Sequence, residues 1–274
     1  MAKAGLVESN KPMASFLLIG TSGTGKTELA RQVAKNLDVP LLKYDMSEYQ
    51  ESHSVSKLIG APPGYAGYDE NSAGLVDDIE QNPNCVLLVD EIEKAHPKVL
   101  DLFLQIMDDA TLKSSQGKTV KFNNVIVLMT SNAGAREGND TPIGFSLQKD
   151  AHKKSVNEAV KKFFRPEFLN RLDGIETFNN LSMADVIRIV DKEIAVVNDM
   201  LSSHGVVLNV SESVKTLIAT EGFDPKMGAR PIKRVIAEKI KKPLSKMIVS
   251  GEVTNGTKVK AQVKDGEIGF IKNK

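Results

Sequence analysis

The chain has 274 residues, of which 41% are hydrophobic, so it is long enough for one large domain and a smaller one, each with its own core. The chain has 36 Lys and Arg residues and 35 Asp and Glu residues, and the resulting net charge of +1 argues against a nucleic-acid-binding surface. The single cysteine, Cys85, excludes an internal disulfide. Neither a membrane-spanning apolar run nor the apolar core of a signal peptide is evident, so we expect a soluble, cytoplasmic protein.

The first informative feature is an apolar strand followed by a glycine-rich loop and a helix. Strand and loop read Ser15–Ile19 and Gly20-Thr21-Ser22-Gly23-Thr24-Gly25-Lys26-Thr27. The loop satisfies G-x-x-x-x-G-K-[ST], and the helix carries Leu29, Val33 and Leu37 on one face. Such a loop directs backbone N–H groups at phosphate oxygens. We expect Lys26 to reach the β- and γ-phosphates of a nucleotide and Thr27 to bind Mg²⁺; the alternative is a turn without a ligand.

A second apolar run, Val86–Val89, ends in Asp90 and Glu91. A continuous apolar run is typical of a buried parallel strand, which would deliver both carboxylates to one sheet edge. Beside a phosphate-binding loop, Asp90 is expected to hold Mg²⁺ through its water shell and Glu91 to polarise the attacking water. The alternative is a helix start, with Asp90 as the N-cap and Glu91 as a first-turn acid.

The order of elements predicts the fold class. Apolar runs at 16–19, 40–42, 86–89 and 125–129 favour a parallel sheet covered by helices, that is, an α/β domain over residues 1–178. Helical periodicity then marks 186–201, 214–222 and 231–244, and alternation at 258–264 and 268–271 around Asp265-Gly266 predicts a hairpin. We therefore expect a smaller, mainly helical domain with a β-ribbon over residues 179–274.

Several separated motifs carry a resemblance to a known family. They are Gly60–Tyr68 (GAPPGYAGY), Val89–Pro97 (VDEIEKAHP), Met129–Gly134 (MTSNAG), Pro166–Asp173 (PEFLNRLD) and Gly228–Pro231 (GARP). With the phosphate-binding loop, they make the sequence similar to the second ATPase module of Clp-type AAA+ unfoldases. The resemblance covers nearly the whole chain, and it implies ATP and Mg²⁺ as ligands and a hexameric ring as the working assembly.

The resemblance also assigns roles in ATP hydrolysis. Asn132 matches the family's first sensor, and its place after the strand at 125–129 would put its amide between Lys26 and Glu91, where it can orient water. Without the resemblance, an Asn-Ala-Gly turn is the simpler interpretation. Arg171 matches the arginine finger, which in this family acts on the neighbouring subunit's nucleotide. Arg230 matches the second sensor, which touches the γ-phosphate in cis; an ordinary surface arginine is the alternative.

The loop around Tyr65 resembles the family's pore loop, in which an aromatic ring grips an unfolded polypeptide, and Tyr68 is expected to assist. Turn-forming residues on both sides place Tyr65 in a loop, where a tyrosine more commonly lies flat on its own domain. Relatives usually carry valine at the position of Ala66. The resemblance therefore implies unfolded proteins as the substrate.

Ile143, Gly144 and Phe145 lie in an otherwise polar loop. The tripeptide resembles the element by which ClpA-type unfoldases bind the ring peptidase ClpP, and disaggregases of the family lack it. Docking of these residues onto their own domain is the alternative. The tripeptide favours a subunit that works with a ClpP-type peptidase over a ClpB-like disaggregase.

The family has a helix and a Gly-Gln turn that close over the adenine, upstream of the segment that begins this chain. We therefore expect a fragment or a truncated form, and an assembly module that binds nucleotide without turnover is a second hypothesis. A DNA-acting AAA+ protein is a third, which the near-neutral charge and the Gly64–Gly67 segment disfavour.

Overall fold

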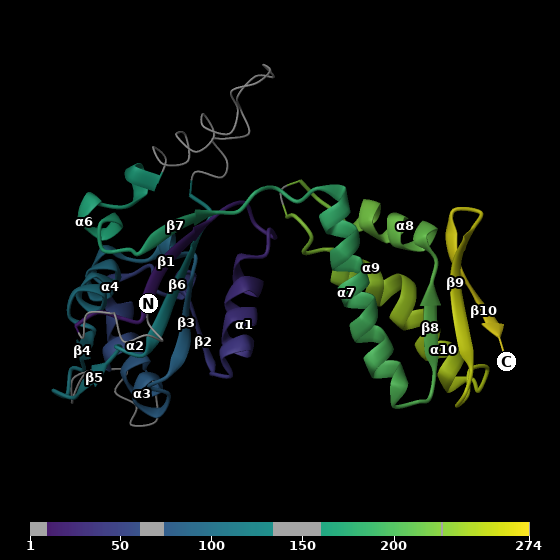
Figure 1. The fold of residues 1–274 in the computed structure, drawn as a ribbon, viewed down its shortest axis with the longest axis horizontal. Helices are drawn as coiled ribbons and strands as arrows, with labels where there is room; N and C mark the ends of the chain where they lie inside the picture. Colours follow the sequence, from purple (N-terminus) through teal and green to yellow (C-terminus); the bar gives the residue numbers. More distant parts are fainter. Residues whose placement is uncertain (1–9, 61–73, 134–159, 226, 274) are drawn as a thin grey trace, which may run out of the picture. The chain divides into compact units, whose positions relative to one another are not determined.

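A computed structural model describes residues 10–60, 74–133, 160–225 and 227–273 of the chain (Figure 1). The chain divides into two compact units. The first comprises Met1–Gly20 and Gly25–Phe178, and the second comprises Thr21–Thr24 and Asn179–Lys274. Each unit has a hydrophobic core of its own, as independently stable domains require.

Within the described residues, the first unit is built on a five-stranded parallel sheet. Its strands are β1 (Ala14–Ile19), β2 (Leu41–Asp45), β3 (Cys85–Asp90), β6 (Val125–Ser131) and β7 (Gly174–Thr177). They lie in the order β2-β3-β6-β1-β7, and neighbouring strands run parallel. Val86, Leu87 and Leu88 of β3 are fully buried because helices cover both faces of the sheet. The predicted α/β class is confirmed.

Helices and short turns connect these strands (Figure 1). The helices are α1 (Lys26–Leu37), α2 (Val55–Ile59), α3 (Leu75–Gln81), α4 (Pro97–Asp109) and α6 (Pro166–Leu169). Short 3₁₀ turns cover Met46–Glu48, Ser52–Ser54 and Ile92–Lys94, and a small hairpin pairs β4 (Thr111–Lys113) with β5 (Thr119–Lys121). Helices α4 and α6 both begin with proline. Proline lacks a backbone N–H, which costs nothing at the first helical position because an N–H there has no partner within the helix.

Successive residues of β1 face opposite sides of the sheet. Leu17 and Ile19 belong to the larger core, which also contains Phe103 and Ile106 of α4. Leu18 belongs to the smaller core on the α1 side. This alternation is the strand's two-residue period, applied here to a sheet that is buried on both faces.

Helix α1 packs on the sheet through small side chains. Ala30 and Ala34 are buried against apolar residues of β1, β3 and β6. Leu29 and Leu37, which the periodicity places on one apolar face with Val33, are instead 39% and 37% exposed. The buried face of α1 is therefore the alanine face, because small side chains let a helix lie close to a tightly packed sheet.

The second unit combines helices with a sheet. Its helices are α7 (Met183–Ser202), α8 (Glu212–Gly222), α9 (Ile232–Ile236) and α10 (Lys242–Val249), with a π-helical segment at Ala237–Lys241. Its strands are β8 (Val207–Val210), β9 (Lys258–Lys264) and β10 (Glu267–Asn273), in the order β10-β9-β8. The predicted antiparallel hairpin of β9 and β10 is present, and β8, which pairs parallel to β9, extends it.

Local sequence explains where these helices begin and change. Ser182 and Asp185 form a capping box at the start of α7, and the hydrogen bonds from Ser182 lower the pKa of the Asp185 carboxyl. The helix expected from about Pro231 is interrupted by the π-helical segment just before Pro243, whose ring crowds the preceding turn. None of the helices in the described ranges is both long and apolar enough to cross a membrane.

A side-chain amide joins α7 to β8. Asn198 Nδ2 donates to the Leu208 carbonyl at 3.0 Å, and Asn198 Oδ1 accepts from the Leu208 N–H at 2.8 Å. Asn198→Ala leaves both backbone groups without this partner, so we expect the free energy of unfolding to fall by about 1–3 kcal/mol in urea denaturation. Asn209→Ala, at an exposed position of β8, is the control, with an expected change below about 0.5 kcal/mol. Equal losses in the two variants would contradict this prediction.

Candidate active site

The predicted phosphate-binding loop joins β1 to α1. Gly25 directly precedes α1 and has a φ of 102°, a conformation that glycine adopts without steric cost. A Cβ atom added at Gly25 would meet no atom within 4 Å, so the space beside this end of the loop is open. An open approach to the N-terminus of a twelve-residue helix suits phosphate oxygens, because the first N–H groups of the helix have no partner within it.

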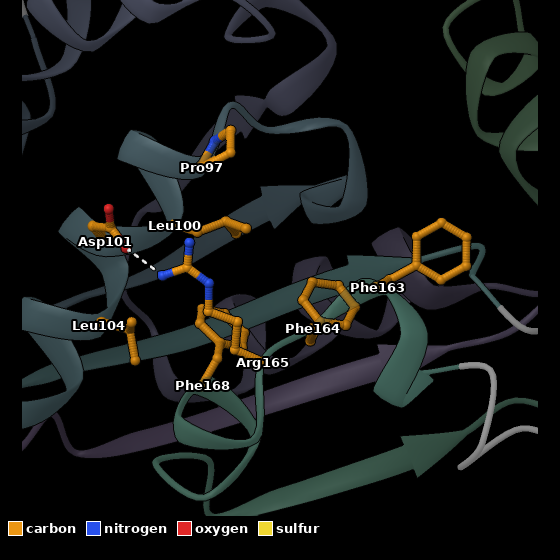
Figure 2. Close-up of a pocket in the computed structure, with 8 residues that line it drawn as sticks. All are labelled: Pro97, Leu100, Asp101, Leu104, Phe163, Phe164, Arg165 and Phe168. Atoms are coloured by element: carbon orange, nitrogen blue, oxygen red, sulfur yellow. Dashed lines mark ion pairs between the residues drawn. The ribbon is translucent and has the colours of Figure 1, made fainter.

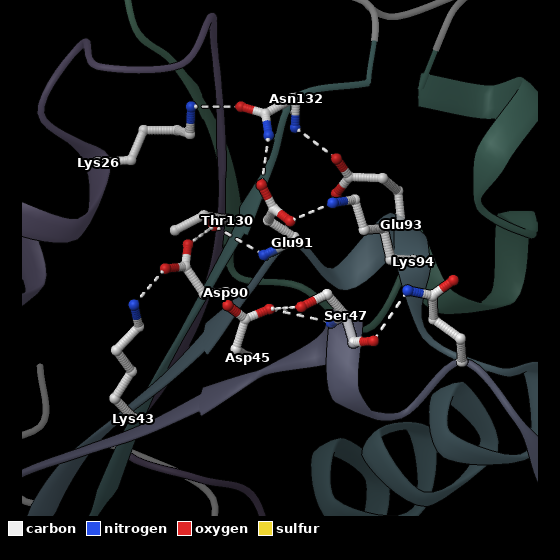
Figure 3. Close-up of polar contacts among 11 residues, drawn as sticks. Lys26, Lys43, Asp45, Ser47, Asp90, Glu91, Glu93, Lys94, Thr130 and Asn132 are labelled. Atoms are coloured by element: carbon white, nitrogen blue, oxygen red, sulfur yellow. Dashed lines mark hydrogen bonds and ion pairs between the residues drawn. The ribbon is translucent and has the colours of Figure 1, made fainter. Parts of the chain in front are cut away.

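Lys26 lies at the start of α1 with its side chain almost fully buried. Its Nζ donates to the Gly20 carbonyl at 2.6 Å. It also donates to Asn132 Oδ1 at 3.0 Å, as Figure 3 shows. Gly20 follows β1, and Asn132 follows the neighbouring strand β6. The ammonium group is therefore held at the carboxyl ends of two parallel strands, the edge at which open α/β sheets bind their ligands.

Asp90 ends β3 and is held from both sides. Its Oδ1 accepts a hydrogen bond from the Thr130 hydroxyl at 2.5 Å, and its Oδ2 pairs with Lys43 Nζ at 2.8 Å. Thr130 belongs to β6 and Lys43 to β2, the two strands that flank β3. The parallel register thus fixes the orientation of this carboxylate at the sheet edge.

Glu91 has φ 56° and ψ 48°, the left-handed conformation that is uncommon for residues other than glycine. Asn132 Nδ2 donates to Glu91 Oε1 at 3.3 Å, and Lys94 Nζ donates to Glu91 Oε2 at 2.5 Å. The hydrogen bond to Glu91 raises the pKa of Lys94, which keeps this ammonium charged. A 3₁₀ turn does follow at Ile92–Lys94, but the Glu91 side chain does not cap it. Glu91 therefore points to Asn132 and Lys94, as Figure 3 shows.

The structure adds residues to which the sequence analysis assigned no role. Glu93 Oε1 accepts from the Asn132 backbone N–H at 3.0 Å, so Asn132 is held at its backbone as well as its amide. Lys43, Lys94 and Thr130 complete the set of contacts around the two carboxylates. One sequence signal could have found Thr130: it lies two residues before Asn132, and that spacing puts both side chains on the same side of an extended strand.

The remaining predicted site residues include two arginines, Arg171 and Arg230. Arg171, which follows α6, is half-exposed and pairs through Nε with Asp108 Oδ1 of α4 at 2.6 Å. Arg230 is exposed in the turn before α9 and belongs to the second unit. The predicted pore-loop residues Tyr65 and Tyr68 and the predicted docking residues Ile143-Gly144-Phe145 fall outside the described residues.

A separate apolar pocket of about 130 Å³ lies between α4 and the segment leading into α6 (Figure 2). Leu100, Leu104 and Phe164 are among its lining residues, and Arg165 pairs with Asp101 at 3.6 Å at the same place. It shares no residue with the polar set around Lys26. Its mainly apolar lining suits an apolar side chain better than a phosphate group.

The residues present fit ATP and Mg²⁺. The open, left-handed Gly25 and the fixed Lys26 suit phosphates, while the Asp90 carboxylate and the Thr27 hydroxyl are the oxygen ligands that Mg²⁺ prefers. Among the described residues, no group of three or more His, Cys, Asp and Glu side chains is placed to hold a metal alone. This is the usual situation for Mg²⁺ bound jointly by one or two protein groups and substrate phosphates.

A parallel sheet with a phosphate-binding loop after one strand and two carboxylates at the end of a nearby strand defines a P-loop nucleotide-binding domain. Residues 11–175 match the family AAA domain (Cdc48 subfamily), and residues 181–261 match the family described as the C-terminal, D2-small domain of ClpB protein. The chain belongs to the Clp-type AAA+ ATPases.

Its relatives include proteins with different names. It is 43% identical to the chaperone protein ClpB of Aquifex aeolicus over 98% of this chain and 28% of that protein. It is 44% identical to the ClpA homolog protein of Fuscovulum blasticum, over 98% and 33% of the two chains. It is 45% identical to ClpE of Streptococcus pneumoniae, an ATP-dependent Clp protease ATP-binding subunit, over 87% of this chain and 32% of that protein. The chain thus spans only about a third of the length of these relatives.

Proposed function

We propose that this chain is the ATP-hydrolysing module of a protein unfoldase, with residues 1–178 as the ATP-binding domain and 179–274 as the small domain. The observation that carries the proposal is the linkage of Lys26, Asn132 and Glu91 at the carboxyl ends of adjacent strands. A cation for the phosphates and a carboxylate for the attacking water, joined through one amide, are the groups that ATP hydrolysis needs.

Each group has one task in this proposal. The loop Gly20–Thr27 binds the phosphates, with Lys26 Nζ on the β- and γ-phosphates. Thr27 and Asp90 hold Mg²⁺, which supplies charge neutralisation at the phosphate oxygens. Glu91 accepts a proton from the attacking water, and Asn132 holds that water in place.

The ring and its coupling are part of the same proposal. Arg171 serves the nucleotide of a neighbouring subunit in a hexamer, which its exposed position and its pairing with Asp108 support, since neither belongs to the polar set around Lys26. Arg230 senses the γ-phosphate in cis and links the small domain to the nucleotide. Tyr65 and Tyr68 grip the unfolded polypeptide in the pore.

The partner proposed for the assembled ring is a ClpP-type peptidase, contacted by Ile143, Gly144 and Phe145. The name of the Streptococcus pneumoniae relative, a subunit of an ATP-dependent Clp protease, supports this partner. A ClpB-like disaggregase is the second candidate, favoured by the match of residues 181–261 to the ClpB small domain. Identities of 43% to ClpB and 45% to ClpE do not separate the two, so the tripeptide is the discriminating feature.

The test is ATP-dependent degradation of casein by this chain mixed with a ClpP-type peptidase. For the double variant Ile143→Ser and Phe145→Ser, degradation is expected to fall at least about tenfold, because apolar anchors dominate such contacts. Its ATP turnover is expected to stay within about twofold, since the proposal gives Ile143 and Phe145 no part in ATP hydrolysis. Ser146→Ala in the same loop is the control. Equal degradation by the variant and the unaltered chain would count against a ClpP-type peptidase as the partner. No degradation by an unaltered chain that hydrolyses ATP would leave the ClpB-like disaggregase.

A further inference from the structure

Thr130 holds a buried hydroxyl at the carboxyl end of β6. The residue is only 1% exposed, so its hydroxyl must find hydrogen-bond partners inside the protein. It donates to Asp90 Oδ1 at 2.5 Å and accepts from the Glu91 backbone N–H at 3.1 Å (Figure 3). One hydroxyl therefore contacts the side chain of the proposed magnesium ligand and the backbone of the proposed base.

The hydrogen bond from the Glu91 N–H to Thr130 is made at a residue with a strained backbone conformation. Glu91 is in the left-handed region, with φ 56°, and residues with a side chain persist there only when their surroundings hold them. Thr130 accepts the N–H of this very residue. The turn that results sends the Glu91 side chain to Asn132 Nδ2, 3.3 Å from Oε1.

Neighbouring residues act on single groups of the site. Lys43 pairs with Asp90 Oδ2, Lys94 pairs with the Glu91 carboxylate, and Glu93 holds the Asn132 backbone. Thr130 differs because it holds the two consecutive carboxylate residues at once. That double contact requires a group that donates and accepts together, as a hydroxyl does.

We infer that Thr130 is a positioning residue for ATP hydrolysis, whose hydroxyl fixes Asp90 and keeps Glu91 in the left-handed turn that aims it at Asn132. The inference rests on the proposed function, in which Glu91 is the base. It predicts that the hydroxyl group, and not the shape of the side chain, holds Asp90 and Glu91 in place. Valine, which has the shape of threonine without the hydroxyl, should not hold them, and serine should.

The first measurement is structural and needs no turnover. In crystals of the nucleotide-free chain, Thr130→Val is expected to move Glu91 out of the left-handed region and its carboxylate out of hydrogen-bonding reach of Asn132, whereas Thr130→Ser keeps both. If Thr130→Val does not fold, Thr130→Ala removes the same hydroxyl without placing a methyl group against Asp90. A hydroxyl-free variant that retains the Glu91 φ and the Asn132 contact overturns the inference.

The second measurement separates this inference from the proposed function. Thr130→Val is expected to lower kcat for ATP about 100-fold, because the base is misplaced, while KM changes less than about threefold. Thr130→Ser is expected to recover kcat to within about fivefold, and Ser54→Ala, another buried hydroxyl position, to leave it unchanged. If the unaltered chain hydrolyses ATP and Thr130→Val does so equally fast, the inference fails. If the unaltered chain binds ATP without hydrolysis, the proposed function fails and the crystal structures alone decide the inference.

Discussion

Glu91→Gln is expected to lower ATP turnover by this chain about 10²- to 10⁴-fold, because glutamine keeps the length and shape of glutamate and cannot accept the proton of the attacking water. The affinity for ATP is expected to change less than about threefold, since Lys26 and the loop Gly20–Thr27 bind the phosphates in our proposal. Phosphate release measures turnover, and titration with a fluorescent ATP analogue measures affinity. Loss of the first with retention of the second would assign Glu91 to the chemical step.

The matched control is Glu48→Gln, which removes an exposed carboxylate from the 3₁₀ turn after β2. It is expected to leave turnover within about twofold. Wild-type turnover by Glu91→Gln would rule out Glu91 as the base. Tight ATP binding without turnover by the unaltered chain would instead support the hypothesis of an assembly module.

The sequence predicts the central strands well because each is a short apolar run buried on both faces. It misses β7 (Gly174–Thr177), which is only partly buried at the sheet edge and has no apolar run to reveal it. It also misses β8, whose Val207 and Asn209 are exposed, so that the strand is specified mainly by its pairing with β9. Strands with an apolar run of their own, including β2 at the other edge of the sheet, are thus visible in local sequence, whereas β7 and β8 depend on partners far along the chain.

Some residues of the candidate site can be recognised in the sequence, and others only in the structure. Lys26, Asp90 and Glu91 are visible because the loop chemistry and strand ends are encoded in consecutive residues. Lys43 is not, because its contact with Asp90 follows from the register of β2 against β3, in which Asp45 lies opposite Asp90. The buried face of α1 is a similar case, since alanines carry no strong signal of their own. Residues that are placed by contacts between elements thus cannot be identified from the motifs alone.

Arg171→Ala is expected to lower turnover of the assembled chain about 10³- to 10⁵-fold, the usual contribution of an arginine finger. The physical reason is that no other group in the proposal brings a fixed positive charge to the γ-phosphate from a neighbouring subunit. Arg165→Ala is the control, because Arg165 lies on the same segment, is also exposed and pairs with an acid of α4, Asp101. It is expected to keep turnover within about twofold. Wild-type turnover by Arg171→Ala would exclude the finger role.

Mixing two inactive variants tests whether Arg171 acts between subunits. An Arg171→Ala subunit keeps Glu91, and a Glu91→Gln subunit keeps Arg171, so an intact site forms wherever the second supplies its arginine to the first. In rings assembled from equal amounts, roughly a quarter of the heterologous interfaces have this arrangement, so turnover should rise well above that of either variant alone. An arginine acting on its own subunit's nucleotide would give no recovery, because every subunit in the mixture then lacks either its base or its finger.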